Sequence, residues 1–188
     1  MGQVIGVAGA PGAGKTSLVL GLAQVLEDAC ALHMDDYERM TRRPIADVAR
    51  WMHAGADLDA FEFPGLEPEL ARLKDAHRYV LFETQFGRAH RATGRHIDCL
   101  VWIETPPDLA LARNLQAFIA GFLAEPPRHG ERLQWLEGYL GNYVDTVREL
   151  LGMQRERVGA QADLALDGTR PLQELIERAQ GEILRRLP

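Results

Sequence analysis

The segment Gly9-Ala10-Pro11-Gly12-Ala13-Gly14-Lys15-Thr16 lies near the beginning of a 188-residue chain and fits the pattern G-x-x-x-x-G-K-[ST]. Its glycines allow the backbone to curl so that successive N–H groups point inward and form a nest for an anion. A short apolar run precedes the segment and an amphipathic run follows it, which predicts a strand, a phosphate-binding loop and a helix. The alternative is a glycine-rich turn that binds nothing.

The residues of this segment have distinct expected roles in holding a nucleotide. Lys15 can reach the β- and γ-phosphates, and the hydroxyl of Thr16 can ligate Mg²⁺. The chain lacks an Asn-Lys-x-Asp guanine motif and an Asp-x-x-Gly switch motif after its third predicted strand, so a GTPase is not expected. ATP and Mg²⁺ are therefore the predicted ligands, and the predicted nucleotide-binding residues are Gly9, Ala10, Pro11, Gly12, Ala13, Gly14, Lys15, Thr16 and Ser17.

The rest of the chain alternates between strand-like and helix-like segments. Residues 3–8, 30–34, 79–82, 99–103 and 162–166 are predicted strands, and residues 16–28, 44–54, 66–76, 131–158 and 171–187 are predicted helices. The runs at 79–82 and 99–103 are continuously apolar, as in strands that a parallel sheet buries on both faces. The alternation predicts an α/β fold, a parallel sheet with helices on both faces, in a single domain over residues 1–188.

Two further helical features are expected. Thr105 and Asp108 have the spacing of a capping box at the beginning of a helix that follows residue 103. In the long helix from about Glu131, one face is expected to pack against the core, and its members are Leu133, Leu136, Leu140, Val144, Val147 and Leu151. The other side of this helix carries Trp135, Tyr139 and Tyr143, which form either a homodimer surface or part of the core.

Composition excludes several classes of protein. The formal net charge is −6, whereas a general nucleic-acid binder carries a basic footprint. No apolar run reaches membrane-spanning length, so no membrane association is expected. The chain has 2 cysteines, Cys30 and Cys99, and no export signal, which favours the reducing cytoplasm. Its single serine, Ser17, lies inside the phosphate loop segment, which argues against a serine hydrolase.

Carboxylates follow two of the predicted strands. Asp35 and Asp36 come directly after the second strand, and Glu83 ends the third. Because the C-terminal ends of parallel strands face the edge where the phosphate loop lies, these groups are placed to meet a hydroxyl group or a metal near the γ-phosphate. Glu83 is expected to hold Mg²⁺ or its water shell. The alternatives are a solvated acidic turn for the two aspartates and a half-solvated strand end for Glu83.

The order of these pieces resembles the uridine kinase and phosphoribulokinase-like P-loop kinases. The resemblance rests on the phosphate loop, Asp35-Asp36-Tyr37, Leu81-Phe82-Glu83, the run from Thr105 to Arg113, and residues 162–168. It implies the sheet order 2-3-1-4-5, Asp35 as the catalytic aspartate, Glu83 as the magnesium-side acid, Arg113 at the root of a lid, and Gly168 in the loop that encloses the base. Asp36 and Glu38 stand where uridine kinases have a serine and a tyrosine, which is a departure from the pattern.

The acceptor side is expected to involve Asp36, Tyr37, Arg39, Asp57 and Arg88. Asp57 belongs to an acidic and aromatic stretch, residues 54–64, which either binds a hydroxylated acceptor or caps the core through Phe61 and Phe63. Arg88 belongs to a basic loop, residues 87–96, which either grips an anionic substrate or is a solvated loop. Lid and insert segments are expected near residues 37–65 and 113–132.

Arg113, together with Lys15 and Asp35, is expected to act in catalysis, and Arg128 and Arg132 either contribute charge from the lid or are ordinary surface arginines. The predicted function is an ATP-dependent kinase that phosphorylates a hydroxyl group of a small molecule, nucleoside-like or another hydroxylated metabolite. The alternative is a nucleotide-dependent regulatory ATPase or switch that acts on a protein partner.

Overall fold

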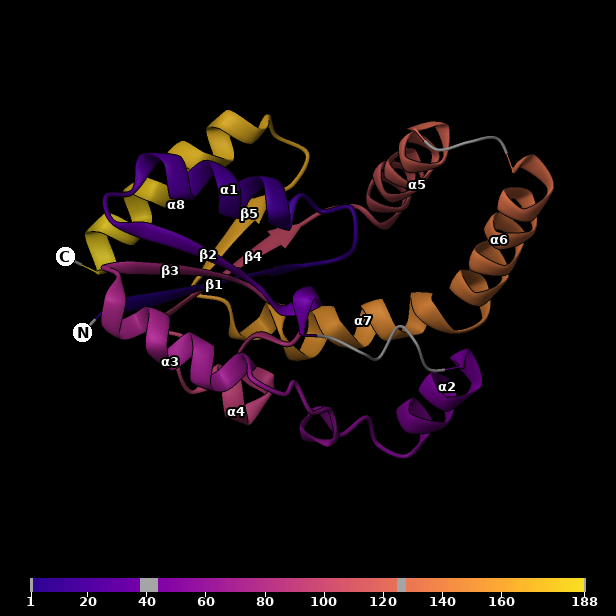
Figure 1. Ribbon diagram of the computed structural model, residues 1–188, viewed down its shortest axis with the longest axis horizontal. Helices are drawn as coiled ribbons and strands as arrows, with labels where there is room; N and C mark the ends of the chain where they lie inside the picture. The colour runs from indigo at the N-terminus through magenta and orange to yellow at the C-terminus, as the bar shows by residue number, and fades with distance from the viewer. Residues whose placement is uncertain (1, 38–43, 125–127, 188) are drawn as a thin grey trace.

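The computed structural model of the chain describes residues 2–37, 44–124 and 128–187, and its centre is a five-stranded sheet (Figure 1). The strands are β1 (Gln3–Gly9), β2 (Ala29–His33), β3 (Tyr79–Glu83), β4 (Cys99–Glu104) and β5 (Leu164–Asp167). Their order is β2-β3-β1-β4-β5, and all neighbouring pairs are parallel. The predicted fold class and strand order are confirmed.

The register of the sheet brings the ends of the strands to one edge. Val7 of β1 lies opposite Glu83 of β3, and Glu83 lies opposite His33 of β2. On the other side of β1, Gly9 lies opposite Ile103 of β4. β1 is central and its apolar side chains are fully buried, so the loop that follows it begins at the middle of this edge. The residues that follow β2, β3 and β4 therefore surround the phosphate loop.

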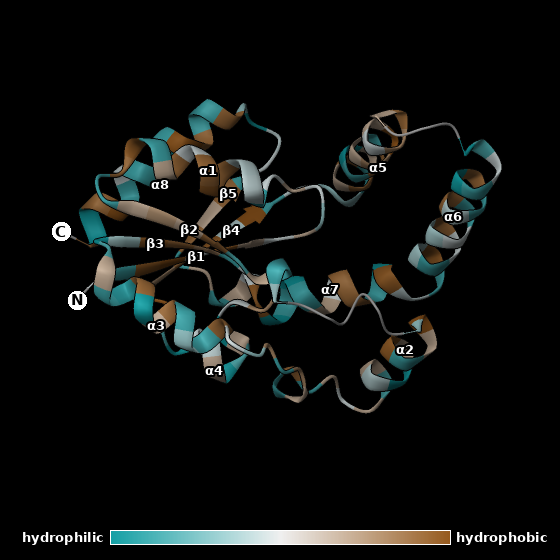
Figure 2. Cartoon of the chain, viewed as in Figure 1, coloured by the Kyte–Doolittle hydropathy of each residue, from teal (hydrophilic) through white to brown (hydrophobic). Residues whose placement is uncertain are grey.

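Helices cover both faces of the sheet. α1 (Lys15–Val25) and α8 (Leu172–Arg186) lie on one face, where Leu18 and Leu22 pack in one core cluster with Ile176 and Ile183. α3 (Leu66–Ala76), the short α4 (Arg91–Gly94) and α7 (Arg148–Arg157) lie on the other face in Figure 1. The strands β1 and β3 are mostly brown in Figure 2, as expected for strands buried between two helical layers.

Three helices extend beyond the C-terminal edge of the strands (Figure 1). They are α2 (Ile45–His53), α5 (Pro107–Ala124) and α6 (His129–Asn142), and α6 continues through a π-helical turn, Tyr143–Val147, into α7. Short 3-10 turns occur at Met34–Asp36, Leu58–Ala60, Gly87–Ala89 and Gly159–Gln161. α2 and α6 contain no buried residue, and α5 buries only Ala110, so these helices add little to the core.

The prediction that one apolar face of the long helix packs against the core is wrong for α6 and the π-helical turn. Leu133, Leu140 and Val144 are exposed, with 67%, 41% and 71% of their surface accessible. The aromatic side faces α5 instead: the Trp135 ring lies 4.8 Å from that of Phe118, edge to face. The rings of Trp135 and Tyr139 stack on each other at 5.4 Å. The helix lies away from the sheet here, and its aromatic side packs against the aromatic side of α5.

The predicted capping box at Thr105 is also not formed. α5 begins at Pro107, and the Thr105 hydroxyl is buried without a hydrogen-bond partner among the described residues. Its Oγ1 atom lies against Gly168, where a Cβ atom would be only 2.0 Å away. Close packing against β5 therefore replaces capping.

Cys30 and Cys99 lie in β2 and β4 as free thiols. Within the described ranges, no helix is both long and apolar enough to span a membrane.

Candidate active site

The phosphate loop connects β1 to α1 and depends on glycine at two positions. Gly12 and Gly14 have φ angles of 82° and 97°, in the left-handed region that disfavours a side chain. A Cβ atom on Gly12 would also lie 2.0 Å from the carbonyl oxygen of Ala110. Gly14 is the N-cap of α1, which has no side-chain cap and no acidic residue in its first turn. The first N–H groups of α1 are thus left for an anion.

Lys15 lies at the centre of this loop. Its Nζ atom donates a hydrogen bond to the carbonyl oxygen of Ala10 at 3.3 Å, which folds the side chain back over the loop. Burial lowers the pKa of Lys15, while the negative charges of Glu83 and Asp35 act in the opposite direction. A bound ligand with several negative charges would act against the effect of burial and favour the charged form of Lys15.

Glu83 is held by two partners. Its side chain is nearly buried, and the Thr16 Oγ1 atom lies 2.9 Å from Oε1 and 3.0 Å from Oε2. His33 approaches from β2, with Nδ1 at 2.6 Å from Oε2. Sequence reasoning did not assign a role to His33. The signal that could have identified it is its position at the end of β2, directly opposite Glu83 in the register.

These groups fit a magnesium ion that arrives with a nucleotide. Thr16, Glu83 and Asp35 line the same cavity and provide one hydroxyl and two carboxylates. In the parts of the chain that the structure describes, no three His, Cys, Asp or Glu side chains are arranged to hold a metal by themselves. Mg²⁺ commonly takes one or two carboxylates, several waters and substrate phosphates rather than an all-protein cage, so the donor set is adequate.

The cavity beside the phosphate loop has a volume of about 360 Å³. Asp35 lines it, and its Oδ1 atom accepts a hydrogen bond of 2.8 Å from Nε2 of Gln85, a second residue that sequence reasoning missed. Asp36 is exposed and does not line the cavity. The far wall comes from the π-helical turn and α7, where Nε2 of Gln154 donates to the carbonyl oxygen of Gln85 at 2.6 Å.

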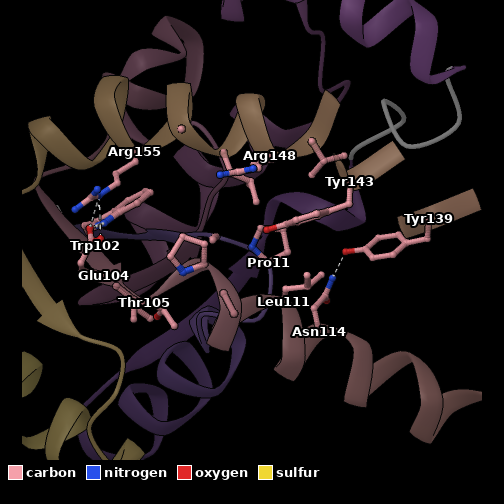
Figure 3. A pocket seen from close by; sticks show the side chains of 17 residues that line it. Pro11, Trp102, Glu104, Thr105, Leu111, Asn114, Tyr139, Tyr143, Arg148 and Arg155 are labelled. Carbon is pink, nitrogen blue, oxygen red and sulfur yellow. Dashed lines mark hydrogen bonds and ion pairs between the residues drawn. The ribbon is translucent and has the colours of Figure 1, made fainter. Parts of the chain in front are cut away.

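A second cavity, of about 280 Å³, adjoins the first and shares Pro11 of the phosphate loop with it (Figure 3). Arg148 lines this cavity, is exposed, and forms no hydrogen bond or ion pair with any described residue. By contrast, Arg155 pairs with Glu104 at 2.9 Å, and Glu104 also accepts from Nε1 of Trp102. Arg148 is thus an unpaired cation beside the phosphate loop. Its sequence context gave no signal, because it lies inside a helix.

The predicted lid arginines have partners elsewhere. Nη1 of Arg113 donates to the carbonyl oxygen of Gly168 at 2.8 Å, so these two predicted residues do meet, but neither lines the two cavities described above. Arg132 contacts the carbonyl oxygen of Phe122, and Arg128 lies 3.5 Å from Glu131 in the first turn of α6. Ser17 is exposed in the first turn of α1.

The basic loop at 87–96 is tied into the fold by its arginines. Arg88 donates to Asp163 at 2.6 Å and to the carbonyl oxygens of Ile97, Asp98 and Gln161. Arg91 pairs with Asp59, and Arg95 contacts Glu67. Because Arg88 lies outside the cavity and its donors are engaged, the structure does not bring it to the predicted acceptor site.

The predicted acceptor segment at 37–65 is brought only partly to the cavity. Asp57 lies outside it and accepts a hydrogen bond from the Asp59 amide, whereas the next residue, Leu58, lines it. Tyr37 packs against the core cluster beneath the sheet. Phe61 is buried and stacks on Phe86 at 5.6 Å, which supports the core-anchor interpretation of this stretch. Arg39 lies outside the described residues.

A parallel sheet of order 2-3-1-4-5, with a phosphate loop between its central strand and the following helix, defines a P-loop NTPase fold of the nucleotide-kinase type. No protein-family profile and no curated protein sequence matches the chain.

Solved structures share this fold. A gluconokinase from Sinorhizobium meliloti 1021 matches 99% of this chain and 93% of its own, with a TM-score of 0.53 and 15% identity. Shikimate kinase from Acinetobacter baumannii, solved in complex with shikimate, matches over 98% and 94% with a TM-score of 0.51 and 19% identity. A sugar kinase from Janibacter sp. HTCC2649, unliganded, matches over 100% and 97%, with a TM-score of 0.51 and 16% identity.

Proposed function

We propose that the protein is an ATP-dependent kinase that transfers the γ-phosphoryl group to a hydroxyl group of a small molecule. The observation that carries this proposal is the composition of one cavity, where Lys15 and Thr16 of the phosphate loop meet Asp35 and Glu83. Phosphoryl transfer requires mainly positioning and neutralisation of charge, and these are the groups that supply both. The kinases of the same fold support the proposal by analogy.

The phosphate end of the cavity binds and orients the donor. The N-terminal N–H groups of α1 and the ammonium group of Lys15 face the phosphates. Thr16 and Glu83 would hold Mg²⁺, which would supply positive charge beside the phosphates. His33 keeps the Glu83 carboxylate oriented toward Thr16, so His33 is a positioning residue.

Asp35 is the group that receives the acceptor's proton. Gln85 fixes one of its carboxylate oxygens, Oδ1, while Oδ2 has no hydrogen bond to a described residue. Oδ2 can therefore accept a hydrogen bond from an incoming hydroxyl group and take its proton as the new O–P bond forms. Asp36, which stays outside the cavity, has no such access.

Arg148 supplies the positive charge that the lid arginines do not supply in this structure. It lines one cavity with Pro11, and its guanidinium group has no partner among the described residues, whereas Arg113 contacts Gly168. A guanidinium group near the moving phosphoryl group matters most in the transition state, where charge is spread over three oxygens. The resemblance to uridine kinase-like proteins implies that Gly168 lies in the loop that encloses the nucleotide base. We therefore expect the Arg113–Gly168 contact to lie on the base side of the site.

α5 and α6, on either side of residues 125–127, form the lid. They are joined by the aromatic cluster of Phe118, Phe122, Trp135 and Tyr139, and by a hydrogen bond of 2.8 Å from Asn114 to the Tyr139 hydroxyl. They contribute little to the core, which leaves them free to move as a pair. Closure over the phosphate loop excludes water from the γ-phosphate until an acceptor is bound.

The narrower resemblance to uridine kinases rests on motif order alone, because the solved structures named above are other kinases. A homodimer and a cytoplasmic location likewise stay predictions.

The proposal is tested by incubating the protein with ATP-Mg²⁺ and a panel of hydroxylated small molecules. We expect slow turnover of ATP alone, and one phosphorylated product per ADP when an acceptor is present. Production of free phosphate that only a protein partner accelerates would support the switch alternative instead.

A further inference from the structure

The wall of the active-site cavity opposite the phosphate loop is apolar. It is formed by Leu58, Phe86, Leu150, Met153 and Val158, which come from three separate parts of the chain. Leu58, Phe86 and Val158 are buried, at 7%, 5% and 1% exposure. Phe86 is further fixed by its stacking on Phe61 at 5.6 Å. Leu58, Phe86 and Val158 thus form a preformed apolar surface, and the half-buried Leu150 and Met153 of α7 complete it.

The amide and charged side chains on the same wall are bound to other parts of the protein. Nε2 of Gln154 donates to the carbonyl oxygen of Gln85, whereas its Oε1 atom is buried and has no hydrogen-bond partner among the described residues. Arg157 donates to the carbonyl oxygens of Ala56 and Gly55, at 2.7 Å and 3.2 Å. Asn114 donates to the Tyr139 hydroxyl. Away from the phosphate loop, the described part of the wall is therefore mainly apolar, and each of these polar groups is engaged by at least one protein partner.

This arrangement discriminates between classes of acceptor. A sugar or other polyol must hydrogen-bond each of its hydroxyl groups or leave them unpaired against an apolar wall. Each unpaired hydroxyl weakens binding by roughly 10- to 100-fold. An alcohol with an aliphatic or aromatic body needs only one polar contact, to Asp35 at the reacting end.

Accepting the proposed kinase function, we infer that the phosphoryl acceptor is an alcohol whose hydroxyl group is attached to a predominantly apolar body, and not a polyol. This differs from what the names of the gluconokinase and sugar kinase of the same fold indicate for those proteins. Leu150 and Met153, on one face of α7, are the residues that select for this body.

The test uses apolar alcohols and polyols with the full chain, Mg²⁺ and a non-hydrolysable ATP analogue. Cyclohexylmethanol and 2-phenylethanol represent the apolar class, and myo-inositol, glucose and gluconate represent the polyols. We expect ligand-observed NMR to detect saturable binding of the apolar alcohols at least 10-fold tighter than that of any polyol. With ATP, phosphorus NMR should detect a phosphate ester of the apolar alcohols. Equal or tighter binding of a polyol, or no saturable binding of the apolar alcohols, would overturn the inference.

Variants separate this inference from the kinase proposal. Met153→Gln keeps the length of the side chain and should weaken binding of the apolar alcohols at least 5-fold, with ATP-dependent thermal stabilisation unchanged. Leu150→Gln repeats the test at a second position, and Glu149→Gln, at an exposed residue of the same helix that does not line the cavity, is the control. If a polyol is phosphorylated in an Asp35-dependent reaction, the kinase function stands and the inference fails. If no alcohol is phosphorylated and only free phosphate forms, the kinase proposal itself fails.

Discussion

His33 and Glu83 lie opposite each other on β2 and β3, and the His33 Nδ1 atom is 2.6 Å from the Glu83 carboxylate. The same carboxylate receives the hydroxyl group of Thr16 from the first turn of α1. Glu83, the proposed magnesium-side acid, is thus oriented by His33 on the neighbouring strand and by Thr16 of the phosphate loop. This small network connects the geometry of the sheet to the chemistry of the site.

Glu83→Gln should raise the Mg²⁺ concentration needed for half-maximal activity by about 10- to 100-fold, because a hard cation loses an anionic oxygen or an ordered-water partner. His33→Gln should have a smaller effect in the same direction, since it loosens the carboxylate without removing it. A magnesium titration of the ATP-dependent reaction measures both. An unchanged titration in Glu83→Gln would assign this residue a purely structural role.

Lys15→Ala should remove most of the stabilisation that ATP-Mg²⁺ gives to the fold. At 100 times its dissociation constant, a ligand that binds only the folded state raises the free energy of unfolding by about 2.7 kcal/mol. Thermal unfolding with and without ATP-Mg²⁺ measures this shift. Lys74→Ala is a matched control, because Lys74 pairs with Asp98 outside both cavities. If ATP does not stabilise the unmodified protein, the nucleotide-binding proposal is wrong.

Asp35→Asn should lower acceptor-dependent turnover by about 10²- to 10⁴-fold, the range for loss of a positioned acid–base group, while ATP affinity changes little. Asp36→Asn is the matched control, because the adjacent carboxylate is exposed and does not line the cavity. Steady-state rates and ATP titrations distinguish the two variants. A larger loss in Asp36→Asn would show that the neighbouring carboxylate is the base.

Arg148→Met should reduce the rate of phosphoryl transfer by about 10²- to 10³-fold and weaken ATP binding far less, because its charge is most valuable in the transition state. Arg113→Met should mainly weaken nucleotide binding, since Arg113 contacts Gly168 and lies away from the cavity. Single-turnover rates and ATP dissociation constants, measured for both variants, give the comparison. The reverse pattern would return the rate-enhancing role to Arg113.

Arg88→Met should destabilise the fold by about 1–3 kcal/mol at neutral pH, because the Asp163 carboxylate loses its charged partner. Burial of Asp163 opposes its ionisation, but the hydrogen bonds from Arg88 and the Leu100 amide hold its pKa below the ordinary value. The stabilisation is therefore present at neutral pH and is lost as pH falls through this lowered pKa. Urea unfolding at several pH values should show the two proteins converging on acidification. A pH-independent difference would contradict a role through Asp163.

The sequence alone determined the phosphate loop and the parallel α/β class, whereas the strand order was expected from the resemblance to uridine kinase-like proteins. The loop is local: Gly12 and Gly14 take left-handed φ angles that glycine readily adopts, and Lys15 follows directly, so spacing in the chain fixes geometry in space. The apolar strands were also readable, because a parallel sheet buries both faces of each strand. Asp35, which follows β2, and Glu83, which ends β3, could be placed because the C-terminal ends of parallel strands meet at one edge.

Tertiary structure alone decided which charged groups pair with one another. His33 and Glu83 are 50 positions apart, and Arg88 and Asp163 are 75 positions apart, so their pairing depends on strand register and loop path rather than on local pattern. The same holds for Arg148, which lines a cavity with Pro11 because α6 and α7 return toward the end of the sheet (Figure 1). A periodic helix likewise does not specify which face finds a partner. Here the aromatic side of α6 packs against the aromatic rings of α5, while Leu133 and Leu140 stay exposed.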